Sequence, residues 1–256
     1  LNLIKGLPVE RRNYLDIQIE QFSLIGNKYY TVLNEFNNIL KKRNNILKNA
    51  SSGLMIDDMY FDVLTQFLIN KIVYIYKSRR KYVDRLNDFI GDIYFKLTGY
   101  KELKVVYKTD IVLDENLENN LKEMFKQNKN KEMIVGSTLI GPQKDDILFL
   151  LNDKELKKYG SQGQQRMAVI ALKMASIEIL RRYDKVTPIL LLDDVFSELD
   201  SEKRNSLFEY IYDNVQTFIT TTDLSNLNEE LVKLARIFNV DNGNIVAIGE
   251  VIRNGK

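Results

Sequence analysis

The chain of 256 residues contains no cysteine and no histidine. The lack of cysteine excludes disulfides and thiolate chemistry and suits a reducing cytosol, so we expect a cytoplasmic protein. The lack of histidine excludes imidazole acid–base catalysis and imidazole metal ligands, which leaves carboxylates to hold any metal. No apolar run approaches the roughly 20 residues that cross a bilayer. We therefore expect no membrane role, and no signal peptide is visible.

A strong excess of charge of either sign is also missing, since the formal net charge is only +2. The overall electrostatic field of the protein therefore gives no reason to expect nucleic-acid binding, although a local basic face is still able to bind nucleic acid. The apolar content of 45% and the charged content of 28% are ordinary for a globular protein. The length is sufficient for one large core or two small ones.

Hydrophobic spacing predicts two long helices, over 17–48 and 55–97, that pair as an antiparallel hairpin and form a separate helical lobe. Residues 7–16 read as a strand end and turn. From residue 161 onward, helices alternate with strands, which predicts a parallel sheet flanked by helices. The further elements expected are a strand at 102–107, a helix at 117–126, a hairpin of 147–151 with 155–159, helices at 164–183, 201–212 and 228–236, strands at 188–192 and 215–220, and a hairpin within 236–252 around Asp241-Asn242-Gly243.

An apolar run that ends in two acids, Ile189 to Asp194, is the most informative segment. An all-apolar strand needs both faces covered, and ligands of parallel sheets bind beyond the carboxyl ends of the strands. Mg²⁺ prefers few carboxylates together with water and phosphate oxygens. We therefore assign Asp193 to the metal through water, and Asp194 to the orientation or deprotonation of an attacking water. The plain alternative is that both acids cap the next turn.

A glycine-rich turn, Gly160-Ser161-Gln162-Gly163-Gln164-Gln165-Arg166, precedes this strand. Ser161 and Gln164 form a capping box, which by itself explains the pattern. A helix N-terminus also attracts anions, so Ser161, Gln162, Gly163 and Gln164 are candidates for contact with the γ-phosphate of ATP. We expect this turn to lie far from the magnesium acids of its own copy. A two-fold pair with two ATP molecules between the copies follows as a hypothesis.

Two further segments complete the nucleotide-site hypothesis. Ser197 and Asp200 are able either to cap the following helix or to face the nucleotide across a dimer interface, and spacing does not decide between these. Thr221 and Thr222 follow the next strand and offer hydroxyls for phosphate, with Thr222 the catalytic candidate. A phosphate loop of the form G-x-x-x-x-G-K-[ST] is missing, because residues 249–256 have the wrong spacing.

Four motifs together resemble the RecF family of bacterial recombination mediators. They are Gly141-Pro142-Gln143-Lys144-Asp145-Asp146, the turn at 160–166, Ile189 to Asp200 (ILLLDDVFSELD), and Gln216 to Thr222 (QTFITTT). The resemblance implies an α/β fold: a P-loop NTPase head sub-lobe of the ABC-ATPase type, similar to heads of structural-maintenance-of-chromosomes proteins, with an inserted helical lobe. We interpret the chain as a fragment without the N-terminal Walker A half. Its expected division is 1–20 (tail of the N-terminal lobe), 21–100 (helical lobe) and 101–256 (C-terminal ATPase lobe).

The resemblance also implies a function. Members of this family are ATP- and Mg²⁺-dependent DNA-binding proteins whose dimer closes with ATP and opens on slow hydrolysis. Their DNA is double-stranded, gapped or a junction of single and double strands. Their partners are RecR and RecO, which help to load RecA at gaps. The family usually reads GPHRDD where this chain has Gln143 and Lys144, so a guanidinium fork is replaced by a point charge.

Basic residues on the two long helices are the candidates for DNA contact, with a solvated charged face as the alternative. They are Lys41, Lys42, Arg43, Arg79, Arg80, Lys81 and Arg85, with Lys144 added from the family motif. If the helices pair, the two clusters are expected to flank a groove of DNA width. Two other functions stay open: a non-catalytic interaction module, and a Mg²⁺-dependent nuclease using Asp145, Asp146, Asp193 and Asp194.

Overall fold

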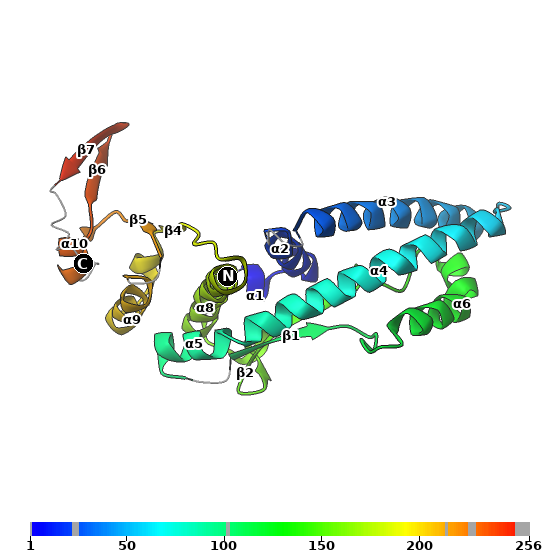
Figure 1. The fold of residues 1–256 in the computed structure, drawn as a ribbon, viewed down its shortest axis with the longest axis horizontal. Coiled ribbons are helices and arrows are strands. Elements are labelled where there is room, and N and C mark those ends of the chain that lie inside the picture. The colour runs from blue at the N-terminus through cyan, green and yellow to red at the C-terminus, as the bar shows by residue number, and fades with distance from the viewer. Residues whose placement is uncertain (1, 22–25, 101–102, 213–214, 225–228, 249–256) are drawn as a thin grey trace.

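The computed structural model describes residues 2–21, 26–100, 103–212, 215–224 and 229–248. They form an elongated molecule with a helical arm at one end and smaller α/β layers at the other (Figure 1). The helices are α1 (Asn2–Lys5), α2 (Pro8–Glu20), α3 (Gly26–Ser51), α4 (Asp58–Asn87), α5 (Ile90–Thr98), α6 (Leu117–Val135), α7 (Leu156–Tyr159), α8 (Gln162–Ile179), α9 (Ser201–Tyr212) and α10 (Glu229–Leu234). The strands are β1 (Leu103–Lys108), β2 (Asp146–Leu151), β3 (Lys154–Glu155), β4 (Leu190–Asp193), β5 (Thr217–Thr220), β6 (Ile237–Asp241) and β7 (Asn244–Ile248).

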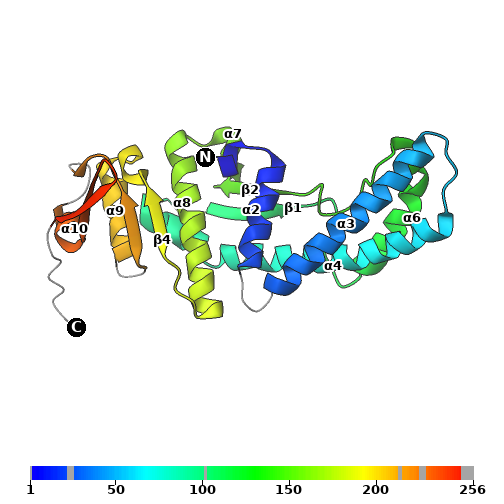
Figure 2. The ribbon, with the colours of Figure 1, turned by 90° about the horizontal axis from the view of Figure 1, so that it is seen from above.

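The arm is an antiparallel pair of long helices, α3 and α4, as the hydrophobic spacing predicts. The turn between them uses Gly53 with a φ of 79°, a conformation that glycine adopts without cost. Asp57 then caps α4 by accepting a hydrogen bond from the backbone N–H of Tyr60 at 3.0 Å. Helix α6 packs on both α3 and α4, so the helical lobe includes a segment that lies after residue 100 (Figures 1 and 2).

The start of the chain differs from the sequence-based expectation. Residues 8–20 form helix α2 rather than a strand end and turn. Pro8 stands at the first helical position, where its missing N–H costs nothing, and Glu10 accepts a hydrogen bond from the N–H of Leu7 at 2.7 Å. The expected helix over 17–48 is therefore divided between α2 and α3, and that over 55–97 between α4 and α5.

Buried ion pairs attach the arm to the rest of the molecule. Arg79 of α4 donates to both carboxylate oxygens of Asp16 in α2 at 2.9 Å, and to the carbonyl of Pro142 at 2.8 Å. Arg11 of α2 forms a bidentate ion pair with Asp146 at the start of β2. Tyr107 of β1 donates to Asp145, the pKa of which is raised because the carboxyl is buried. The 141–146 segment is thus bonded to both α2 and α4.

The first sheet has the strand order β1-β2-β3 and is antiparallel, with Val105 opposite Phe149. The second half of the expected 147–159 hairpin is only partly a strand, because β3 has two residues and helix α7 follows at once. Helix α8 packs against α5, and α5 also packs against α9. The core is continuous from the arm base through α5 and α8 to α9.

The second sheet is a parallel pair of β4 and β5, as the helix–strand alternation predicts. Leu190 and Leu192 of β4 are buried, whereas Leu191 is 72% exposed and Phe218 of β5 is 53% exposed. The expectation that both faces of this apolar strand are covered is therefore wrong for the described residues, which cover one face only. The pair lies beside α9, between the arm side of the molecule and the C-terminal hairpin (Figure 1).

The C-terminal hairpin is confirmed. Strands β6 and β7 pair with Asp241 opposite Asn244, and Asn242 and Gly243 of the turn have φ values of 48° and 81°. The part of the expectation that reaches Ile252, and the 249–256 segment, lie outside the described residues. Helices long and apolar enough to cross a membrane are absent from the described ranges.

Candidate nucleotide site and basic surface

The two candidate magnesium acids stand at the carboxyl end of β4, both exposed. Asp193 accepts a hydrogen bond from the hydroxyl of Thr220, the facing residue of β5, at 2.5 Å. The backbone N–H of Asp194 donates to the carbonyl oxygen and the hydroxyl of Thr220, each at 3.2 Å. Thr220 therefore fixes the position of the strand end, a role that sequence reasoning missed.

Asp194 has a left-handed backbone, with φ of 51°. This conformation is uncommon outside glycine, and aspartate and asparagine are among the residues that tolerate it. It turns the chain sharply after β4 into a short 3-10 turn, Val195–Glu198. The sharp turn leaves the Asp194 side chain exposed at the sheet edge, where ligands of parallel sheets bind.

The segment after this turn is held by local bonds. The Ser197 hydroxyl donates to the Asp194 carbonyl at 2.8 Å. Asp200 accepts from the backbone N–H of Lys203 at 3.0 Å and so caps α9. Side-chain and backbone hydrogen bonds from Lys203 lower the pKa of Asp200. The capping alternative thus holds for Asp200, and a nucleotide contact by Ser197 or Asp200 stays a prediction.

The two threonines after β5 lie at the same sheet edge as Asp193, because β4 and β5 are parallel. The Thr221 hydroxyl donates to the carbonyl of Asp223 at 3.0 Å, within a local turn. Thr222 is exposed. The structure thus places both residues at the sheet edge where the candidate magnesium acids stand, and contact of their hydroxyls with phosphate stays a prediction.

The expected capping box at the tip of α8 is present. Ser161 accepts from the N–H of Gln164 at 3.2 Å, and Gln164 accepts from the N–H of Ser161 at 2.9 Å. Because the serine oxygen accepts in this bond, its own O–H remains able to donate to an anion. A Cβ added at Gly163 would meet only the Ser161 oxygen, at 4.0 Å, so the space over this glycine is open.

Gln165 is a further residue of this turn that sequence reasoning passed over. Its side chain is buried, and its amide donates to the carbonyls of Leu156 and Gly160 at 3.1 and 3.0 Å. It therefore holds the backbone that leads into Ser161. The available signal was its spacing, because Gln165, Ala168 and Leu172 fall on the buried face of α8.

The helix tip and the strand end fit a phosphate and a Mg²⁺ ion, respectively. The 18-residue helix α8 presents unpaired N–H groups, a serine hydroxyl and an open glycine, which suit a phosphate. Among the described residues, no group of three or more acids could hold a metal. Mg²⁺ at Asp193 would accordingly take most of its ligands from water and phosphate, as this ion prefers.

Two of the arginines predicted to contact DNA are buried, so that prediction is wrong for both. Arg43 is 0% exposed; it donates to Glu132 of α6 at 2.6 Å and to Thr138 at 2.7 Å, and its guanidinium lies 4.5 Å from the Phe61 ring centroid. Burial lowers the pKa of Arg43, although the bond to Glu132 opposes this. Arg79 is 3% exposed and paired with Asp16.

The other basic candidates reach the surface, although in separate places. Lys41, Lys42, Arg80, Lys81 and Lys144 are exposed, and Arg85 is half-buried with its guanidinium 4.0 Å from the ring centroid of Tyr183. Arg43 of α3 donates to Thr65 of α4. Because the two helices are antiparallel, Lys41 and Lys42 lie opposite about residue 66 of α4. The second cluster begins roughly 11 residues further along α4, or about 16 Å. The two clusters therefore do not face each other across a groove, contrary to expectation.

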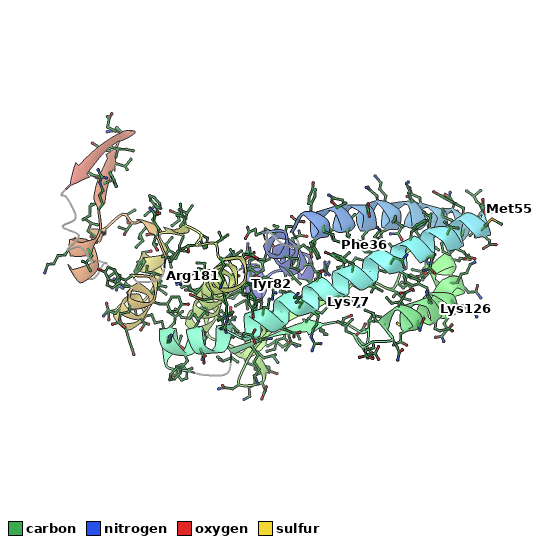
Figure 3. The ribbon with its side chains drawn as sticks, viewed as in Figure 1. Phe36, Met55, Lys77, Tyr82, Lys126 and Arg181 are labelled. Atoms are coloured by element: carbon green, nitrogen blue, oxygen red, sulfur yellow. The ribbon has the colours of Figure 1, made fainter. Side chains whose placement is uncertain are left out.

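The cluster on α4 does line a groove of its own, of about 360 Å³, between α4 and residues 113–117. Its basic members are Lys77, Arg80, Lys81 and Arg85. Asp84, Asp88 and Asp114 also line it, and Asp84 pairs with Arg80 at 3.0 Å. The groove is basic with acids interspersed. Lys77 marks its place midway along α4 (Figure 3).

A parallel strand pair ending in acids, joined to a capped, glycine-bearing helix tip, defines the fold as part of an ATPase head of the ABC type.

No model in a scan of protein families matches the chain. DNA replication and repair protein RecF of Lactobacillus johnsonii is 36% identical over 252 residues, covering 96% of this chain and 67% of its own length. RecF of Bacillus cereus is 36% identical, covering 96% and 66%. The chain belongs to the RecF family.

A solved structure agrees with this assignment. The recombination mediator protein RecF with ATP, of the RecFOR pathway, superposes with a TM-score of 0.80 at 28% identity. The match covers 97% of this chain and 65% of that protein. The chain thus spans about two thirds of the length of the relatives that it matches.

Proposed function

We propose that these residues form part of an ATP-dependent DNA-binding protein of recombinational repair and replication restart. ATP with Mg²⁺ closes two copies on gapped, junction-containing or double-stranded DNA, and slow hydrolysis releases them. The protein acts with RecR and RecO to assist loading of RecA at single-strand gaps. Membership of the RecF family, with the glycine-rich turn at 160–166 (the signature turn) and the strand-end acids Asp193 and Asp194 both in place, is the observation that supports this function most.

The bound nucleotide would supply the phosphoanhydride bond to be cleaved and most of the magnesium ligands. Asp193, oriented by Thr220, would hold the metal through water. Asp194 would orient the attacking water, and Thr221 and Thr222 would donate hydroxyls to phosphate oxygens. The helix tip at Ser161 would donate to the γ-phosphate bound by the opposite copy. The backbone cradle of a phosphate loop would come from the part of the family's length that lies outside these residues.

Two of the four acids proposed for a nuclease, Asp145 and Asp146, are engaged in contacts that hold the fold together. Asp146 is paired with Arg11, and Asp145 accepts from Tyr107 beneath the arm. Burial alone would raise the pKa of Asp146, but hydrogen bonds from Arg11 and the Ile147 N–H outweigh it and lower the pKa. These two acids maintain the fold and do not join Asp193 and Asp194. A non-catalytic interaction module remains the second candidate for the residues taken alone, because the groups that cradle phosphate are not among them.

Replacing Ser161 by arginine in the complete protein is expected to abolish ATP-dependent pairing of two copies while leaving ATP binding by each copy within about twofold. The arginine would fill the open space over Gly163, where the opposite nucleotide is expected. Sedimentation velocity with ATP and Mg²⁺ measures the pairing, and fluorescence titration with a labelled ATP analogue measures the binding.

Ser161→Thr is the matched control, because threonine keeps both the cap and the hydroxyl and should preserve pairing. Unchanged pairing of the Ser161→Arg variant would refute the shared-site arrangement and with it the proposed role of the signature turn.

Neutralising the groove on α4 is expected to reduce the salt dependence of DNA binding. In the triple variant Lys77→Gln, Arg80→Gln, Lys81→Gln, the slope of log affinity against log salt should fall by roughly 0.9 for each phosphate that the protein no longer neutralises. Fluorescence anisotropy with a gapped duplex between about 50 and 200 mM salt measures this slope.

Lys126→Gln on α6 is the control, since this lysine is exposed and lies outside the groove (Figure 3). An equal slope in the wild type and the triple variant would show that the groove residues do not contact DNA phosphates. The exposed pair Lys41 and Lys42 would then be the next residues to test.

A further inference from the structure

A cross-strand pair of polar side chains stands at the edge where β4 and β5 end (Figure 1). Asp193 is the last residue of β4, Thr220 is the last residue of β5, and the two are directly opposite in the parallel register. Both are exposed. They share the open face of the strand pair with Leu191 and Phe218, because alternate residues of a strand point to the same face. The candidate magnesium acid and this threonine therefore meet at the open edge of the sheet.

The Thr220 hydroxyl engages both candidate acids. It donates its proton to Oδ1 of Asp193 at 2.5 Å and accepts the backbone N–H of Asp194 at 3.2 Å. A hydroxyl has one proton, so Thr220 has none to give to a phosphate while this bond lasts. The Thr221 hydroxyl differs, because it donates to the carbonyl of Asp223. Thr220 is thus tied to the acids, whereas Thr221 and Thr222 are the candidates for phosphate.

The bond from Thr220 determines which part of the Asp193 carboxylate is left for a metal. Oδ1 is occupied by the hydroxyl, in the strong type of hydrogen bond that an ionised acceptor forms. Oδ2 remains to accept a proton from a metal-bound water, which is the role proposed for Asp193. A contact of both carboxylate oxygens with one ion would require the Thr220 bond to break. The geometry therefore holds Asp193 as a ligand that offers one oxygen.

Divalent cations differ in what they take from such a carboxylate. Mg²⁺ keeps several waters, accepts one or two carboxylates and demands near-ideal octahedral geometry. Ca²⁺ takes roughly 6–8 oxygens in a flexible geometry, and its carboxylate ligands are mono- or bidentate. A carboxylate with one oxygen already engaged therefore suits Mg²⁺ better than Ca²⁺.

We propose that Thr220 is a specificity-determining residue of the nucleotide site, which favours Mg²⁺ over Ca²⁺ by engaging Oδ1 of Asp193. The inference rests on the proposed function, which places a metal at Asp193. Thr220 acts through Asp193, without touching the metal or a phosphate, and is in this sense a positioning residue.

Thr220→Val in the complete protein tests this role. Valine has nearly the shape of threonine, lacks the hydroxyl and suits a strand. The N–H of Asp194 also donates to the carbonyl of residue 220 at 3.2 Å, a bond that the substitution keeps, so the turn after β4 should persist. Pairing of two copies with a non-hydrolysable ATP analogue is measured by sedimentation velocity while Mg²⁺ or Ca²⁺ is titrated. The readout is therefore independent of ATP turnover.

The ratio of the half-maximal concentrations, Ca²⁺ over Mg²⁺, is expected to fall by about tenfold in Thr220→Val, the lower end of the effect of removing a residue that orients a metal ligand. More Mg²⁺ should be needed, because Asp193 is no longer held in place. Less Ca²⁺ should be needed, because both oxygens of Asp193 become available to one ion. A threonine that bound the metal itself would give another result, since its loss would raise both concentrations.

Thr220→Ser keeps the hydroxyl and should preserve the wild-type ratio. Thr217→Val is the matched control at the other end of β5, where the hydroxyl donates to the carbonyl of Val215 at 3.0 Å, and it should also leave the ratio unchanged. Circular dichroism checks that each variant is folded. A folded Thr220→Val protein that pairs with Ca²⁺ no better than the wild type does would overturn the proposal.

Failure of this test is distinguishable from failure of the proposed function. Wild-type copies that do not pair at all with Mg²⁺ and the nucleotide would contradict the shared site, and with it this inference. Wild-type copies that pair normally, with an ion preference that Thr220→Val leaves unchanged, would contradict the role of Thr220 alone.

Discussion

Replacing Asp194 by asparagine in the complete protein is expected to lower ATP hydrolysis by on the order of 10²-fold or more, the range that a positioned general base contributes. ATP-driven pairing should persist, because Asp193 and the signature turn are unchanged. The variant should therefore accumulate as a closed dimer with bound ATP. Single-turnover hydrolysis and the rate of dimer dissociation after dilution measure the two effects.

Asparagine is the suitable substitution for a structural reason. Asp194 has a left-handed backbone, which asparagine tolerates, so the turn after β4 should be preserved. The backbone bonds from its N–H to Thr220 do not depend on the side chain. Loss of activity in this variant will accordingly report the carboxylate and not a displaced loop.

Two further variants separate the roles of the acids. Asp193→Asn should raise the Mg²⁺ concentration needed for half-maximal activity, because it removes the carboxylate assigned to the metal. Glu209→Gln, at an exposed acid on α9, should change neither quantity. Faster dissociation of the Asp194→Asn dimer than of the wild type would contradict the role given to Asp194.

The elements that local pattern controls could be read from the sequence. The paired helices of the arm follow from apolar residues at three- and four-residue spacing, and the parallel β4–β5 pair follows from alternation of helix and strand. The Ser161–Gln164 capping box is a contact between residues three positions apart, so its bonds were predictable as well. The resemblance to the RecF family noted from the sequence rests on the same local motifs.

The roles of the arginines depend on partners distant in sequence. Glu132 lies 89 residues from Arg43, and Asp16 lies 63 residues from Arg79. Both arginines were grouped with neighbouring basic residues because of their residue type alone. Periodicity held the opposite signal, since Arg43 falls on the buried face of α3 between Phe36 and Leu47. An arginine at an apolar position requires a buried acid, and the sequence alone does not identify which one.

The exposed faces mark a second limit of sequence reasoning. The apolar run at 189–192 predicts cover on both sides of the strand, whereas Leu191 remains 72% exposed among the described residues. The exposed apolar residues Met59, Val63 and Phe67 of α4 were equally hidden, because a helix that is apolar on two faces looks merely hydrophobic in a periodicity count. Such patterns show that an apolar surface needs cover and do not show what supplies it.

Replacing Glu132 by alanine is expected to destabilise the protein by about 3–5 kcal/mol, the cost of leaving one partner of a buried ion pair uncompensated. Arg43 would remain 0% exposed between α3, α4 and α6 without its carboxylate. The N–H of Leu139 would also lose its acceptor, Glu132 Oε1 at 2.8 Å. At roughly 2–4 °C per kcal/mol for a protein of this size, the midpoint of thermal unfolding should fall by about 10 °C.

Asp84→Ala is the matched control, because it breaks the exposed Arg80–Asp84 pair, and such pairs contribute about 0–1 kcal/mol. Calorimetry or circular dichroism of the 256-residue chain measures both variants. A Glu132→Ala midpoint no lower than that of Asp84→Ala would show that the Arg43–Glu132 pair does not hold the arm together.

The double variant Arg43→Met, Glu132→Met tests whether the unpaired buried charge of Arg43 is the cause of the instability expected for Glu132→Ala. Removal of both charges leaves no buried charge unpaired at this site, and methionine side chains are able to pack against Phe61 and Phe125, which flank the Arg43 guanidinium. The part of the loss that comes from the unpaired charge should therefore return, as it does when buried ion pairs are replaced by apolar residues, whereas the N–H of Leu139 lacks its acceptor in both variants. The same variant tests the correction made for DNA binding. Since Arg43 lies inside the arm, its replacement should leave DNA affinity and the salt slope unchanged once stability is restored, whereas a lower slope would mean that this arginine reaches the phosphates after all.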